Sequence, residues 1–291
     1  MTDLNDQWMI GADGLSHSED GISWTRLGSL ESSLTGIIRE PDRIVAAAGF
    51  GSGLWEWTTG AERWKQLHDE TLTEVLAIAP TSGNPGLIAG SPYGISTASR
   101  DEVGAARWQH HSDDLRVNER YTNAILVDPY ETDSWLIGTE AGLLIATEGG
   151  AAWERTSLSE VPVRALHYAL DTYWAGTDGN GIWRSSDGQR WDRAGNNEED
   201  ASIYDLAVSD GQILAGSGTG VLSGDGTGRW QRTGPRMLTA AIGAHPGDSA
   251  DWLAGSAPGG LWRTDDGGIT WRQIDGFKGV LSILAPGGTQ A

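Results

Sequence analysis

Short runs of alternating apolar and polar residues recur along this chain, and glycine bounds each run at two positions. An apolar pair followed by glycine ends one predicted strand, as in Met9-Ile10-Gly11 and Leu253-Ala254-Gly255. A second glycine, three to five residues later, opens the next strand. Glycine suits a tight hairpin that needs positive φ, and it also suits a place where neighbouring sheets crowd together. The pattern predicts antiparallel strand pairs, repeated seven times.

A tryptophan closes each of the seven units and defines the length of the repeat. Consecutive tryptophans are 40, 44, 45, 38, 39 and 41 residues apart. A period of roughly 40–45 residues is typical of a β-propeller, in which each repeat forms one four-stranded blade. We therefore predict an all-β, seven-bladed propeller with four antiparallel strands per blade, in a single domain over residues 1–291. The seven tryptophans are Trp24, Trp64, Trp108, Trp153, Trp191, Trp230 and Trp271.

The two ends of the chain predict how the ring closes. The first unit supplies strands at 8–10, 15–18 and 24–27, with nothing before them to serve as an innermost strand. A spare apolar strand follows the last unit at 279–284. We expect this C-terminal strand to become the innermost strand of the N-terminal blade, since an open ring would expose unpaired strand edges.

The hairpin before the closing tryptophan carries a motif of its own in three units, at 18–24, 186–191 and 264–271. Each copy has Ser or Thr, then Asp, Gly and Trp, and it resembles the Asp-box (BNR) repeat of sialidase-like propellers. An Asp side chain can accept hydrogen bonds from the turn backbone, while the indole covers the hairpin. The resemblance implies a structural role for these residues and no catalytic one. They are Asp20 and Trp24, Asp187 and Trp191, and Asp266 and Trp271.

Candidate binding residues come from the loops and from the mouth of the channel, because function on this fold lies outside the repeat. Alignment of the predicted innermost strands places a carboxylate, an amide, a guanidinium and a phenol on one rim, a set that suits a polar or anionic ligand. The alternatives are a water-filled channel lining and, for the long loops at 111–120 and 195–201, solvated acidic turns. The rim column is Gly36, Glu74, Asn123, Arg164, Tyr204, Thr239 and Gly279, with Arg116 in the first long loop and Arg120, Arg236 and Lys278 just outside the rim.

Composition narrows the classes of partner. The formal net charge of −20 disfavours nucleic acid and anionic membrane surfaces. The absence of cysteine excludes disulfides and thiolate catalysis, and we expect no metal and no cofactor. With neither a leader-like N-terminus nor an 18-residue apolar run, we expect a cytoplasmic protein without membrane insertion. The acidic composition, with only two lysines, resembles that of salt-loving archaea, and the alternative is a high-GC genome with an ordinary acidic surface.

Three propeller families resemble this repeat and imply different functions. Sialidases have six blades and an arginine triad, of which only Arg164 and Tyr204 have counterparts here. Xyloglucanase-type glycosidases place the substrate between two propellers, and hydrolysis needs two facing carboxylates, whereas Glu74 is the only one in the rim column. Length and blade number agree best with the photosystem II assembly-factor type, which implies a non-catalytic platform for another protein. The alternatives are a glycoside hydrolase or lyase acting on a polysaccharide, and a module that binds a carbohydrate or a small anionic ligand.

Overall fold

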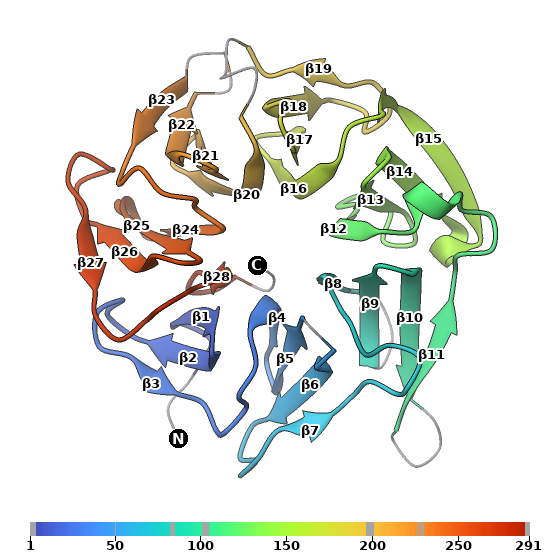
Figure 1. Ribbon diagram of the computed structural model, residues 1–291, viewed down its shortest axis with the longest axis horizontal. Coiled ribbons are helices and arrows are strands. Elements are labelled where there is room, and N and C mark those ends of the chain that lie inside the picture. Colours follow the sequence, from blue (N-terminus) through green and yellow to red (C-terminus); the bar gives the residue numbers. More distant parts are fainter. Residues whose placement is uncertain are drawn as a thin grey trace.

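The computed structural model describes residues 4–49, 51–81, 85–100, 105–195, 201–225, 227 and 230–288. Seven four-stranded antiparallel sheets surround a central axis, as the ring in Figure 1 shows. Within these ranges the helical segments are two single 3₁₀ turns, η1 (Val117–Glu119) and η2 (Glu148–Gly150). The predicted all-β, seven-bladed architecture is confirmed.

Each blade is built from four strands that run outward from the axis. Blade 1 contains β28 (Ser282–Leu284), β1 (Trp8–Ala12), β2 (Gly14–Ser18) and β3 (Thr25–Arg26). Blade 2 contains β4 (Leu34–Glu40), β5 (Arg43–Ala48), β6 (Gly53–Thr58) and β7 (Lys65–Gln66). Blade 3 contains β8 (Ala77–Pro80), β9 (Pro85–Ser91), β10 (Gly94–Arg100) and β11 (Ala106–His110).

The remaining blades follow the same order. Blade 4 contains β12 (Thr122–Val127), β13 (Trp135–Thr139), β14 (Gly142–Thr147) and β15 (Ala152–Ser159). Blade 5 contains β16 (Val163–Ala169), β17 (Thr172–Thr177), β18 (Ile182–Ser185) and β19 (Asp192–Arg193). Blade 6 contains β20 (Ile203–Ser209), β21 (Gln212–Ser217), β22 (Gly220–Gly224) and β23 (Trp230–Thr233). Blade 7 contains β24 (Ala241–His245), β25 (Asp248–Ser256), β26 (Gly260–Thr264) and β27 (Arg272–Ile274).

The C-terminal strand closes the ring, as predicted. β28 pairs antiparallel with β1, and Ile283 lies opposite Ile10 (Figure 1). The paired strand is shorter than the predicted 279–284 because the Val280 N–H donates to the Ser256 carbonyl of blade 7. The segment before β28 therefore belongs to the seam between the last blade and the first.

A buried arginine reinforces this closure. Arg39 on β4 is only 3% exposed, and its guanidinium donates five hydrogen bonds to backbone carbonyls. Nη1 bonds to the Leu4 and Gln7 carbonyls at 2.9 and 2.6 Å, while Nε and Nη2 bond to the Gly288 carbonyl at 3.0 and 2.9 Å. Nη2 also bonds to the Ala285 carbonyl. One side chain of blade 2 thus joins segments from both ends of the chain.

The two glycine columns have different physical causes. Gly176 ends β17, and a Cβ at this position would lie 2.5 Å from Ile203 Cγ2 of the next blade. Gly142 opens β14 with φ of +125°, and a Cβ there would lie 2.5 Å from the Leu158 carbonyl oxygen. The first column thus lets adjacent blades approach near the axis, whereas the second forms the hairpins. Apolar clusters fill the spaces between successive blades, such as Leu214, Ile242 and Trp252 between blades 6 and 7.

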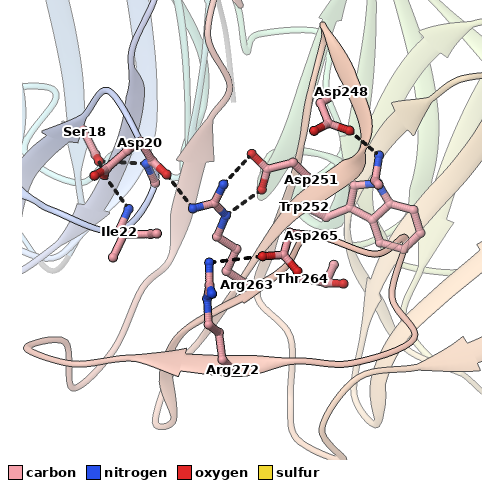
Figure 2. A network of polar contacts seen from close by, with 12 residues as sticks. Ser18, Asp20, Ile22, Asp248, Asp251, Trp252, Arg263, Thr264, Asp265 and Arg272 are labelled. Atoms are coloured by element: carbon pink, nitrogen blue, oxygen red, sulfur yellow. Dashed lines mark hydrogen bonds and ion pairs between the residues drawn. The ribbon is translucent and has the colours of Figure 1, made fainter.

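The three Asp-containing turns share one pattern of hydrogen bonds. Asp20 Oδ1 accepts from the N–H groups of Ile22 and Ser23 at 2.8 and 2.7 Å, and Asp187 and Asp266 accept from their turns in the same way. These backbone donors lower the pKa of Asp20 to about 2. Arg263 on β26 pairs with Asp251 at 2.7 and 3.0 Å and donates to the Asp20 carbonyl, so this turn also ties blade 7 to blade 1 (Figure 2).

Candidate functional site

The upper face is formed by the loops that lead into the innermost strands and by the hairpins between the second and third strands. In four blades the innermost strand starts with a β-bulge. A bulge leaves one residue unpaired and redirects its side chain. The four bulged residues at the rim are Thr35, Asn123, Arg164 and Tyr204.

The register of the strands corrects part of the predicted rim column. Asn123, Arg164 and Tyr204 occupy equivalent positions, each directly before the residue paired with the glycine of the second strand. In blade 3 the glycine partner is Ala77, so the equivalent residue is Leu76, and Glu74 lies two positions earlier. The alignment was also out of register at Gly36, Thr239 and Gly279, whose blades place Thr35, Ala240 and Leu281 at this position. The cause is the bulge, which the apolar pattern does not reveal.

Arg164 is the centre of a polar cluster on the rim. Its Nη1 lies 3.0 Å from Glu140 Oε1 and donates to Asn123 Oδ1 at 3.2 Å, while Nη2 donates to Asp178 Oδ2 at 2.9 Å. Asn123 also donates to Glu140 at 3.1 Å, and the Ser202 hydroxyl donates to Asp178 at 2.6 Å. The Ser202 bond and the Arg164 guanidinium lower the pKa of the Asp178 carboxyl. The cluster joins blades 4, 5 and 6 and contains two carboxylates that share one guanidinium.

Sequence reasoning missed three members of this rim cluster. Glu140 and Asp178 lie in the hairpins after β13 and β17, and Ser202 directly precedes β20. The available signal was their place on the upper face, since each hairpin follows the glycine of its second strand. Tyr204 lies in the next blade, beside Gly218 of the hairpin after β21.

The loop between β11 and β12 is held by a buried carboxylate. Glu119 is 3% exposed and accepts from Arg155 Nε and Nη2 at 2.7 and 2.8 Å. It also accepts from the Arg116 backbone N–H at 2.9 Å. Although burial opposes ionisation, the hydrogen bonds from Arg155 and Arg116 leave the pKa of Glu119 lowered. The loop is therefore anchored from within.

The same loop exposes apolar side chains. Val117 is 86% exposed and Tyr121 is 37% exposed, next to Arg116, whose side chain is 70% exposed. Tyr93, in the hairpin after β9, is 72% exposed. This hairpin contacts the start of the loop, since a Cβ at Gly94 would lie 1.9 Å from Ser112 Oγ. We call Tyr93, Arg116, Val117 and Tyr121 the upper-face patch.

The other predicted binding residues are spread over the upper face. Arg120 donates to the Leu115 carbonyl at 3.3 Å, within its own loop. Arg236 is exposed in the loop before β24, and Glu74 is half-buried before β8. The structure thus brings Asn123 and Arg164 together, and places Glu74, Arg120 and Arg236 apart in the loops before blades 3, 4 and 7. Of the predicted loop at 195–201, residues 196–200 lie outside the described residues.

A buried carboxyl inside the ring was not predicted. Asp205 on β20 stands where the equivalent residue of most blades is Ala or Gly. Its two oxygens accept from the backbone N–H groups of Leu206, at 2.8 Å, and of Ile242 in blade 7, at 2.7 Å. Burial raises the pKa of Asp205 to about 7. This carboxyl is consequently close to half protonated at neutral pH.

Two other kinds of site were examined within the described ranges. No group of three or more His, Asp or Glu side chains there is arranged to hold a metal ion. None of the helices in that part of the chain is long and apolar enough to cross a membrane.

Comparisons with known proteins identify the class of fold. No protein-family model and no curated protein matches the chain. Among solved structures, it is similar to the GH74 xyloglucanase from Xanthomonas campestris, with a TM-score of 0.67 and 17% identity, over 91% of this chain and 46% of that one. It is also similar to the extracellular domain of a putative one-component system from B. thetaiotaomicron, with a TM-score of 0.64 and 16% identity, over 95% and 46% of the two chains.

A third similar structure is the computationally designed Ika8 protein, with a TM-score of 0.65 and 15% identity, over 98% of this chain and 92% of that one. The chain spans less than half the length of the xyloglucanase and of the extracellular domain. At such identities these similarities show the seven-bladed propeller fold and nothing about the activity of this chain.

Proposed function

We propose that this protein is a non-catalytic platform that binds another protein through its upper face. One observation carries this proposal: a loop anchored by a buried ion pair presents Val117, 86% exposed, to solvent. Fixing a loop in advance lowers the entropy cost of binding. An exposed apolar residue in such a loop, flanked by tyrosine and arginine, has the composition of a protein-binding surface.

The rim cluster supports the same function. A glycoside hydrolase needs one carboxyl with a raised pKa as its acid and a second carboxylate opposite it. On the upper face, Glu140 and Asp178 both pair with Arg164, and the pKa of Asp178 is lowered. These two groups are suited to hold the rim together and to accept hydrogen bonds. They do not form an acid–base pair.

Affinity purification with paired variants tests the platform. The tagged protein is incubated with a lysate of its source organism, alongside Val117→Glu and Ile269→Glu. Ile269 is 83% exposed in the turn before β27 on the opposite face, so it matches Val117 in exposure. We expect a stoichiometric partner with the unaltered protein and with Ile269→Glu, and a loss of at least tenfold with Val117→Glu. A partner retained equally by all three would refute the upper-face assignment.

The second candidate is hydrolysis of a polysaccharide. Three of the similar structures are GH74 enzymes, and Asp205 has the raised pKa that a general acid needs. The test is release of reducing ends from xyloglucan by the unaltered protein and by Asp205→Asn. Release that disappears in Asp205→Asn would favour the hydrolase, and the absence of release from the unaltered protein would reject it for this substrate.

A further inference from the structure

The ring encloses a cavity of about 910 Å³ that is separate from the upper-face patch. Its wall is made by the innermost strands β12, β16, β20, β24 and β28 and by residues 285–288. It extends from Asp205, near the start of β20, to the lower hairpins that contain Asp210 and Gly247. Pockets of roughly 300–1,000 Å³ hold ligands of drug size.

The charge of the wall has one sign. The charged residues that line the cavity are Asp205 and Asp210, and none of the lining residues is lysine or arginine. The remaining wall is largely apolar and includes Leu166, Val208 and Ile283. A wall of this kind attracts a cation that carries an apolar body, and it repels an anion.

Asp205 lies at the inner end of the cavity and retains capacity to bind. Each of its oxygens accepts one backbone N–H. An ionised carboxylate has about four lone-pair sites, so two remain for a ligand. Its pKa is raised because burial outweighs the two hydrogen bonds from Ile242 and Leu206. A bound cation would stabilise the ionised form that burial disfavours.

Two histidines and a tyrosine complete the polar lining. Burial lowers the pKa of His167 on β16 to about 4, so its imidazole is neutral at pH 7. His167 makes no side-chain hydrogen bond to any described residue, and it lines the cavity. His245 on β24 accepts from the Gly247 N–H through Nδ1, and Tyr168 lies on the same wall. Neutral imidazoles accept hydrogen bonds from an ammonium group, and a tyrosine ring can face a cation.

We propose that the central cavity binds a small organic ammonium ion, with the Asp205 carboxylate as its counter-ion. The ammonium group lies between Asp205 and the neutral imidazole of His167, and the apolar body of the ligand packs against the aliphatic wall. The ligand enters from the lower face, past Asp210 and the hairpin of Gly247. This site is independent of the partner that binds the upper face.

Isothermal titration with three probes of one shape tests the charge preference. The probes are 4-phenylbutylamine, 4-phenylbutanol and 4-phenylbutyrate, which are cationic, neutral and anionic at pH 7.5. We expect the amine to bind at least tenfold more tightly than the alcohol, and the acid not to bind. Equal affinity of the amine and the alcohol, or no binding of the amine, would overturn the proposal.

Two further measurements locate the ammonium group. In Asp205→Asn the affinity for the amine should fall to within about threefold of that for the alcohol, whereas Asp192→Asn, on exposed β19, should bind like the unaltered protein. If Asp205→Asn does not fold, the unaltered protein still decides. Titration at pH 7.0 in two buffers of different ionisation enthalpy should show release of about half a proton per amine bound, since the pKa of Asp205 is about 7. Binding without proton release would place the amine elsewhere.

Discussion

Replacement of Arg39 by methionine should be among the most damaging single changes in this protein. Arg39 is 3% exposed and joins backbone carbonyls near both ends of the chain, at Leu4, Gln7, Ala285 and Gly288. Methionine keeps a similar length and removes every donor. The change therefore tests the hydrogen bonds more than the packing.

The expected cost follows from the burial of each bond. The bond to the Gln7 carbonyl is fully buried, and its loss costs about 1–3 kcal/mol because the carbonyl loses a charged donor away from water. The other three carbonyls are partly buried, and water replaces the donor at roughly 0.5–1 kcal/mol each. We expect about 3–5 kcal/mol in total, a large share of the roughly 5–15 kcal/mol that stabilises most domains. Arg39→Lys should cost less, because it keeps the charge but loses the planar arrangement of donors.

Urea unfolding followed by tryptophan fluorescence measures this cost. The chain has 15 tryptophans, and buried Trp8 follows Gln7 directly, so closure of the first blade is reported. The matched control is Arg272→Met, which removes an exposed arginine paired with Asp265 on the outermost strand of blade 7. The control should lose less than about 1 kcal/mol. If Arg39→Met also stays within about 1 kcal/mol of the unaltered protein, the Arg39 contacts do not stabilise the closure.

Three further predictions concern pH, the upper loop and the seam. Asp205 has a raised pKa, so the folded chain binds more protons than the unfolded chain between about pH 4 and 7, and the free energy of unfolding falls across this window by at most about 4 kcal/mol. Asp205→Asn should remove this fall in urea titrations at pH 5 and 7.5, and an unchanged slope would contradict the assignment. Glu119 has a lowered pKa, so its contribution is present above about pH 4.5 and is lost as the pH falls through the folded-state pKa. At pH 7, Glu119→Gln should expose the loop at 111–121 to proteolysis several-fold faster, while Glu131→Gln should not. Truncation after Leu281 removes β28 and leaves the inner edge of β1 unpaired, and size-exclusion chromatography should show aggregate. A monomer with the circular dichroism of the full chain would disprove this role of the seam.

The architecture was predictable because it depends on local patterns that recur. The tryptophan spacing set the number of blades, and the two glycine columns marked the second and third strands of each one. Closure through the C-terminal strand followed from counting strands in the first unit, and the pairing of Ile283 with Ile10 confirms it. Only the exact start of β28 differed, because Val280 bonds to the previous blade.

The site was less predictable because it depends on how separate blades meet. A bulge adds one residue to an innermost strand, so an alignment by apolar pattern slips by one or two positions, as it did at Glu74. Glu140 and Asp178 reach Arg164 from hairpins of two blades, and nothing in their local sequence indicates this meeting. Asp205 has the same difficulty, since its partner Ile242 lies in the next blade. The protein partner, the salt-loving source and the cytoplasmic location remain predictions.

The pairing of β1 with β28 sets a schedule for synthesis. β1 leaves the ribosome early, and its partner strand follows roughly 270 residues later. At roughly 5–20 residues per second, the inner edge of β1 waits on the order of 15–55 s before its hydrogen bonds can form. During that time five or six complete blades can fold behind an unfinished first one. The nascent chain therefore has to keep one sticky strand shielded until translation is nearly over, and slower translation should increase the loss of newly made protein to aggregation.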